Sequence, residues 1–262
     1  MIKIFRKIRS GLLEKNLPAR EGTAKQVGKT GRYLTYALGE IVLVVIGILI
    51  ALQINNWNEN RVNKQLEQEI LLSVKREIQE NQTLLSKAIK DHTAVLKSLE
   101  KLNNMISPEP EEITINLLDS LMYGVGWLPE YVPKDGVLNS IISSGKISLI
   151  RNDQISSMLA SWNSELSNYK VNTKYNEKQL FEEILPYIRD KYPLKSMVPF
   201  FTERIHSKST FPFSQEELLS DFGFENLVSN RVIDANQTLV YAQILFDFQN
   251  EILELIDSEL KE

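Results

Sequence analysis

The chain has 262 residues, 43% of them apolar and 24% charged, a composition typical of a folded protein with a sizeable core. It contains no cysteine and only two histidines, which excludes disulfides and a cysteine nucleophile and leaves little material for a metal centre or catalytic triad. The net charge of −4 is unevenly distributed: residues 1–36 hold nine Lys or Arg and two Glu, whereas the remainder holds 21 basic and 32 acidic residues. This acidic remainder is a poor candidate for binding nucleic acid.

Residues 1–36 are predicted to be a cytoplasmic leader and linker. Within residues 1–15, one face of a helix would be apolar and most of the rest basic, a pattern that favours a helix lying among cytoplasmic lipid headgroups. The alternative is a disordered positive leader that only sets the topology. Residues 16–32 are polar and contain Gly and Pro, which is typical of a flexible linker.

Residues 37–57 are predicted to form a single transmembrane helix. The eighteen residues from Ala37 to Ile54 include only two strongly polar side chains. As a helix they would extend about 27 Å, close to the hydrocarbon thickness of a bilayer. Aromatic residues stand at both expected membrane interfaces: Tyr33, Tyr36 and Trp57.

The flanks of this span predict its orientation. Basic residues precede it, so we expect a cytoplasmic N-terminus and an exported C-terminal domain. No small-residue cleavage site follows it, which favours a retained signal anchor over a cleaved signal peptide.

Four positions in the span are predicted to take part in helix packing: Gly39, Glu40, Gly47 and Ala51. The three small residues share one face, which would let a second helix approach closely, although Leu43 interrupts the row. Ordinary tolerance of glycine in spans is the alternative. The Glu40 carboxylate would face a partner or a cavity, or else extend to the cytoplasmic headgroups.

Residues 58–105 are predicted to continue the span as one long helix. Ten positions follow a strict three–four spacing and form a seam, and eight of them are apolar. They are Leu71, Val74, Ile78, Asn81, Leu85, Ala88, His92, Val95, Leu99 and Leu102. Further apolar residues beside the seam favour a multi-helix bundle. Asn81 could fix register and His92 could be pH-sensitive, or both could be ordinary satisfied bundle positions.

The remaining chain predicts shorter helices separated by loops. After a short helix over 113–122, an irregular stretch carries Trp127 and Tyr131, which could form a partner loop or could pin the loop to the bundle. Helices are then expected over 137–144, with Gly145 as left-handed cap, and from a cap at Asn152 or Asp153 to about Pro193, with a kink at Pro186. A capping box at Ser214 and Glu217 precedes a final helix over about 226–260, for which the inward residues are predicted to be Val228, Val232, Ala235, Leu239, Ala242, Leu245, Leu253 and Ile256.

These patterns predict an all-α protein with a single N-terminal transmembrane helix that continues into an elongated antiparallel helical bundle. The predicted domains are 1–36, 37–57 and 58–262. We find no Gly-rich phosphate loop, zinc-spaced histidine pair, calcium loop or nucleophile elbow. The sequence therefore assigns no catalytic, cofactor-binding or metal-binding residue, and we expect a protein that is not an enzyme.

The run GEIVLVVIGILIALQINNWNENR, with the upstream FRKIR and GRYLTYA and the later SSGKISLIRN, resembles an uncharacterised family of small single-span proteins from Bacteroidetes. The resemblance implies a bacterial inner membrane and a periplasmic C-terminal domain, and it brings no activity. It adds weight to the motif residues Glu40, Gly47, Gln53, Asn55, Asn56 and Trp57.

The leading hypothesis is a non-catalytic, membrane-anchored interaction or scaffold protein. Its partners would be the lipid bilayer and either a second copy or another envelope protein. One alternative is a periplasmic bundle that senses a ligand. Another is an accessory subunit of an ion-driven motor or channel, with Glu40 facing the ion path.

Overall fold

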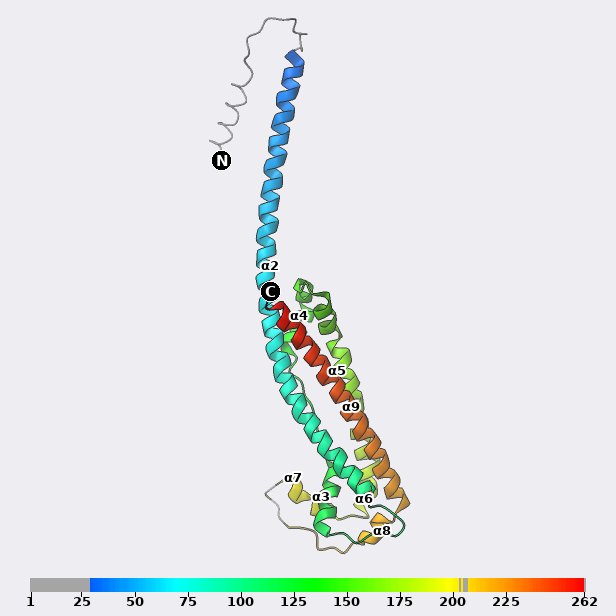
Figure 1. The fold of residues 1–262 in the computed structure, drawn as a ribbon. Helices are drawn as coiled ribbons and strands as arrows, with labels where there is room; N and C mark the ends of the chain where they lie inside the picture. Colours follow the sequence, from blue (N-terminus) through cyan, green and yellow to red (C-terminus); the bar gives the residue numbers. More distant parts are fainter. Residues whose placement is uncertain (1–28, 203, 205–206, 262) are drawn as a thin grey trace. The chain divides into compact units, whose positions relative to one another are not determined.

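The computed structural model describes residues 29–202, 204 and 207–261, with side chains described from Ala37 onward. All regular secondary structure in these residues is helical, so the predicted all-α class is confirmed. The leader and the linker before Lys29 lie outside the described residues. In chain order the elements are α2 (Lys29–Asn103), α3 (Ile115–Gly126), α4 (Gly136–Ser143), η1 (Lys146–Leu149), α5 (Asp153–Gln179), η2 (Leu180–Ile184), α6 (Leu185–Arg189), η3 (Leu194–Met197), α7 (Val198–Phe201), α8 (Gln215–Leu219) and α9 (Phe222–Glu259) (Figure 1).

Residue contacts divide the chain into two units, Met1–Asn60 and Arg61–Glu262, and α2 contributes residues to both. In the described part of the first unit, α2 is the one helix that is long and apolar enough to cross a membrane, and no residue of its most apolar stretch is buried. Its large side chains are widely exposed, for example Ile41 at 59% and Ile54 at 62%. Trp57 is also exposed, whereas the side chains of Tyr33 and Tyr36 lie outside the described part.

The second unit, here called the helical domain, buries the seam predicted on α2. All ten seam positions are buried, including Asn81 and His92, so the predicted spacing is confirmed. The reason is local: a three–four spacing keeps one face of a helix directed at its neighbours. Each buried Leu, Ile or Val is worth about 1.5–3 kcal/mol relative to exposure, so this row contributes much of the stability of the domain.

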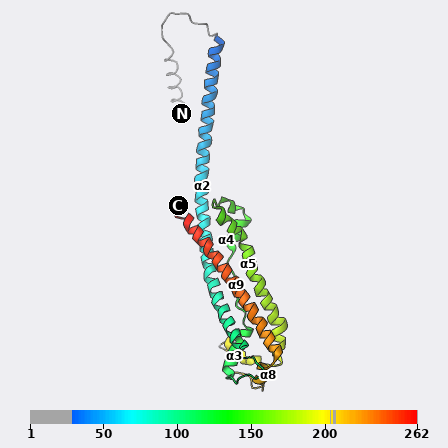
Figure 2. The same ribbon diagram turned by 45° about the vertical axis from the view of Figure 1, so that its right-hand side comes forward.

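Helix α9 runs opposite to both α2 and α5. Lys75 in the middle of α2 pairs with Asp257 near the end of α9, while Ser229 near the start of α9 donates to Asn103, the last residue of α2. On α5, Gln154 donates to Glu251. Figures 1 and 2 show α5 and α9 lying side by side along most of their lengths.

Three apolar clusters follow one another along these helices. The first joins Leu71 of α2, Trp162 of α5 and Ile252 of α9 beside α4 and η1. The second lies midway and includes Tyr131 and Tyr169. The third gathers α3, η2, α6 and α8 around the other end, and its members include Leu99, Met122, Leu180 and Phe224. The small elements thus cover the two ends, and the long helices supply the middle.

Helix ends follow the predicted capping chemistry at three places. Asn152 accepts from the amides of Gln154 and Ile155, and Ser214 accepts from that of Glu217. Gly145 follows α4 with φ of 72°, a left-handed conformation that favours glycine.

Three boundaries differ from the prediction. Helix α9 begins at Phe222, because the Asp221 carboxylate caps the amides of Gly223 and Phe224. Helix α3 continues to Gly126, and Gly124 lies where α3 approaches α2, since a Cβ there would stand 2.7 Å from the Cβ of Ser98. Instead of a simple kink at Pro186, the widened π-turn η2 precedes it and accommodates a residue that has no amide hydrogen.

Candidate functional site

The helical domain contains a cavity of about 570 Å³ between the long helices and the segment 126–132. His92 and Val95 of α2 contribute to its lining, together with residues of α5, η2 and α9. The α3–α4 connection contributes residues 127–132 to the lining, so the cavity lies beside the loop for which the sequence predicted a binding role. We take it as the candidate functional site.

Arg231 of α9 is the most unusual residue of this cavity, since only 2% of it is exposed. Its Nη1 donates to Oδ1 of Asn176, and its Nη2 donates to the carbonyl of Trp127 at 3.2 Å. Its Nε has no hydrogen-bond partner. A buried cation normally pairs with a carboxylate. Within the described residues, none forms an ion pair with Arg231.

Burial lowers the pKa of Arg231 to about 10, and the charge of Asp234, three residues along α9, opposes this. The guanidinium therefore keeps its positive charge at neutral pH. Asp234 is itself partly buried, and this desolvation raises its pKa while Arg231 lowers it. The two groups thus influence each other through space without a direct contact.

His92 lies in the same cavity wall, with its Nε2 3.0 Å from the hydroxyl of Tyr169. Burial lowers the pKa of His92 to about 4; the charge of Arg231 adds to this effect and that of Asp91 opposes it. The imidazole is consequently neutral at physiological pH. Burial also raises the pKa of the Tyr169 phenol, so this pair offers neutral hydrogen-bonding groups beside one fixed cation.

Asn176 connects Arg231 to the neighbouring polar side chains. Its Nδ2 donates to the hydroxyl of Thr238 at 2.7 Å and to the carbonyl of Asn172 at 2.9 Å. Its Oδ1 faces Arg231. The nitrogen and the oxygen of the Asn176 side-chain amide therefore both form hydrogen bonds, and Asn176 fixes the orientation of the Arg231 guanidinium.

The two residues predicted for a partner loop both border this cavity. Trp127 is half-buried and its ring packs on Tyr123, with centroids 5.4 Å apart. Tyr131 is only 5% exposed, and its hydroxyl accepts from Nε2 of Gln249 at 3.1 Å. Tyr131 thus corresponds to the alternative in which aromatic rings pin the loop to the helices, while partner binding through Trp127 stays a prediction.

The residues predicted in the membrane segment belong to the first unit. Gly39, Glu40, Gly47 and Ala51 are all exposed on α2, as are the motif residues Gln53, Asn55, Asn56 and Trp57. A Cβ added at Gly39 or Gly47 would meet no atom within 4 Å. Helix packing through these positions stays a prediction.

Sequence reasoning missed Arg231, Thr238 and Gln249 on α9. It placed Val232, Leu239 and Leu253 inward, but these three are only half-buried. A strict three–four spacing that starts at Val228 and continues to Ala235 and Ala242 also includes Arg231 and Thr238. The spacing alone, without the requirement that each position be apolar, would therefore have predicted these two residues as buried.

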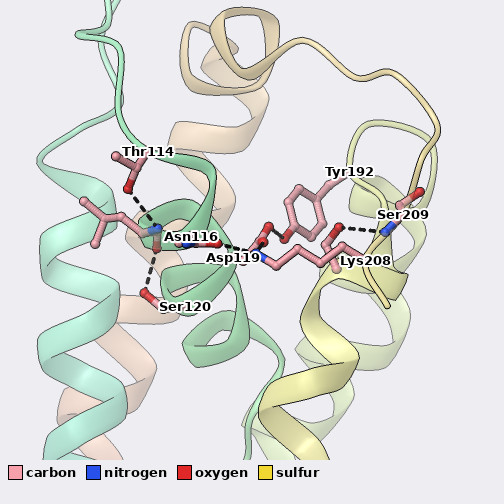
Figure 3. A network of polar contacts seen from close by, with 9 residues as sticks. Thr114, Asn116, Asp119, Ser120, Tyr192, Lys208 and Ser209 are labelled. Atoms are coloured by element: carbon pink, nitrogen blue, oxygen red, sulfur yellow. Dashed lines mark hydrogen bonds and ion pairs between the residues drawn. The ribbon is translucent and has the colours of Figure 1, made fainter. Parts of the chain in front are cut away.

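A second polar cluster lies at the end of the domain near α3 (Figure 3). Asp119 is fully buried and accepts from the hydroxyl of Tyr192 at 2.6 Å and from Nζ of Lys208 at 2.5 Å. Lys208 also donates to Asn116 at 2.6 Å. Because these groups satisfy one another, the cluster is explained as a clamp that holds residues 207–209 against α3. Within the described residues, no group of three or more acidic or histidine side chains is arranged to hold a metal ion.

These features define an all-helical protein with one helix that is apolar and long enough for a membrane span and a helical domain that encloses a cationic cavity. The chain belongs to a family of unknown function, DUF6090, whose model matches residues 40–187. That range begins at Glu40 and ends within α6, so it includes most of the apolar run of α2 and the cavity residues His92 and Asn176 but not Arg231. No curated protein and no solved structure matches the chain.

Proposed function

We propose that this protein is a non-catalytic, membrane-anchored interaction protein of a bacterial inner membrane. The observation that carries the proposal is the exposed apolar surface of α2 over residues 37–54. Its large side chains, including Leu49 at 59% exposure, are not shielded by any neighbour among the described residues. An apolar surface of this length is unfavourable in water and matches the hydrocarbon layer of a bilayer.

The basic N-terminal segment supports an orientation with the N-terminus in the cytoplasm and the helical domain in the periplasm as an elongated antiparallel bundle. The absence of cysteine from the sequence allows a clean test with single cysteines, Ser10→Cys and Ser258→Cys. In cells with a permeabilised outer membrane, a membrane-impermeant maleimide should label only Ser258→Cys. After lysis it should label both variants. Labelling of Ser10→Cys alone before lysis would refute the orientation, and loss of the protein from the membrane fraction in alkaline carbonate would refute the span.

The interaction itself is proposed to involve the face of Gly39, Gly47 and Ala51, contacting a second copy or another envelope protein. Native mass spectrometry of the full-length protein, extracted in mild detergent, tests this idea. We expect a defined oligomer, or a second protein in fixed stoichiometry, that is lost in Gly47→Leu. The control Val45→Leu adds volume to the opposite side of the helix and should keep the assembly. A monomer with no stoichiometric partner would contradict the proposal.

A second candidate function is ligand binding and sensing by the helical domain. One observation favours it, namely the cavity of about 570 Å³ beside Arg231, which falls within the usual range of small-molecule sites of about 300–1,000 Å³.

A further inference from the structure

We propose that the cavity beside Arg231 is a binding site for a small organic monocarboxylate with an apolar, preferably aromatic, body. The proposal concerns the helical domain alone. It rests on the second candidate function, ligand binding by this domain, and does not depend on membrane anchoring.

The charge balance of the cavity is the first reason. Arg231 is only 2% exposed, and its Nε has no hydrogen-bond acceptor. A guanidinium has five N–H donors, and the protein acceptors in the described residues engage two of them, at Asn176 and Trp127. A buried cation with unused donors is costly unless an anion joins it, and a carboxylate matches the planar guanidinium fork.

The polar neighbours of Arg231 favour a single negative charge, since Asp234 acts on the guanidinium only through space and forms no ion pair with it in the described residues. His92 is neutral, and Asn176, Thr238 and Tyr169 are uncharged hydrogen-bonding groups. The exposed charged residues of the lining are two lysines, Lys170 and Lys174, and two glutamates, Glu130 and Glu177, so their formal charges cancel. One interior cation balances one carboxylate, whereas a phosphate dianion would keep an unpaired charge.

The apolar lining accounts for the rest of the ligand. Val95, Leu180 and Ala235 line the interior. The rings of Phe181 and Phe201 also line the cavity while remaining 57% and 53% exposed. Exposed aromatic rings beside a cavity gain free energy when an apolar or aromatic group covers them.

The test uses the full-length protein in mild detergent and three fluorinated probes observed by ¹⁹F NMR: 4-fluorobenzoate, 4-fluorophenylacetate and the neutral 4-fluorobenzamide. We expect at least one of the two acids to bind and the amide, which has nearly the same shape, to bind at least tenfold more weakly. Arg231→Gln should weaken acid binding at least tenfold, because it removes the positive charge and the N–H donors that the carboxylate would use. The control Arg76→Gln removes an exposed arginine of α2 outside the cavity and should keep the affinity.

A second variant covers the case in which Arg231→Gln does not fold. Phe181→Glu adds a negative charge at an exposed lining position, so it should preserve folding, checked by circular dichroism, and weaken acid binding about fivefold by charge repulsion. The proposal is overturned if neither acid binds better than the amide. It is also overturned if the folded variants bind as tightly as the natural protein, or if inorganic phosphate displaces the acids at equal concentration.

Discussion

His92 makes the stability of the helical domain depend on pH in a predictable way. Its imidazole is 6% exposed, lies next to the Tyr169 hydroxyl and is influenced by the charges of Arg231 and Asp91. Burial is the main reason that its pKa falls from 6.5 to about 4. The unfolded chain therefore takes up a proton near pH 6.5, and the folded domain does so only near pH 4.

The difference between the folded and unfolded pKa values of His92 sets the direction in which stability changes with pH. Because the folded pKa is depressed, the stabilising contribution is complete above pH 6.5 and is lost as the pH falls toward and through 4. The full contribution is about 3 kcal/mol, at 1.36 kcal/mol for each pH unit between the two pKa values. At pH 5.0, about 2 kcal/mol of it should already be lost relative to pH 7.5.

The assay compares the natural protein with His92→Gln in mild detergent by urea unfolding at pH 7.5 and 5.0. Tryptophan fluorescence reports the transition, since Trp162 is fully buried. All other titrating groups, including the second histidine, are present in both proteins and cancel in the difference. We expect the natural protein to lose about 2 kcal/mol more than the variant on acidification. Equal losses in the two proteins would refute the assignment of a buried, neutral His92.

Two further predictions concern contacts that hold the loops and α3 against α2. Asn81→Ala removes both hydrogen bonds between its side-chain amide and the backbone of Lys134, at 2.6 and 2.7 Å, and should lower the free energy of unfolding by about 2–3 kcal/mol; a loss below 0.5 kcal/mol would contradict this role. Gly124→Ala places a Cβ 2.7 Å from that of Ser98 and should lower the free energy of unfolding, measured by thermal melts, by about 1–3 kcal/mol. In the control Gly136→Ala the added Cβ meets no atom within 4 Å, so the free energy of unfolding should be nearly unchanged in the same measurement.

The sequence by itself determined the features that depend on neighbouring residues. Helical period, side-chain capping and hydropathy are properties of short segments, so the sequence predicted the features that depend on them. These are the apolar run of residues 37–54, the ten-residue seam of α2 and the caps at Asn152 and Ser214. The left-handed turn at Gly145 belongs to the same group. Each of these requires knowledge of only a few residues along the chain.

Only the tertiary structure decided which polar residues are buried and what they form together. Hydrophobicity favoured Val232 as inward, yet Arg231 is buried, because its acceptors come from Asn176 and Trp127, 55 and 104 residues away in the chain. A polar group can be buried without a large free-energy cost only when hydrogen-bond partners satisfy it. Here those partners are distant in the chain, so the pattern of neighbouring residues does not reveal them. The cationic cavity, the candidate site of this protein, is therefore a product of packing between α2, α5, α9 and the loop after α3.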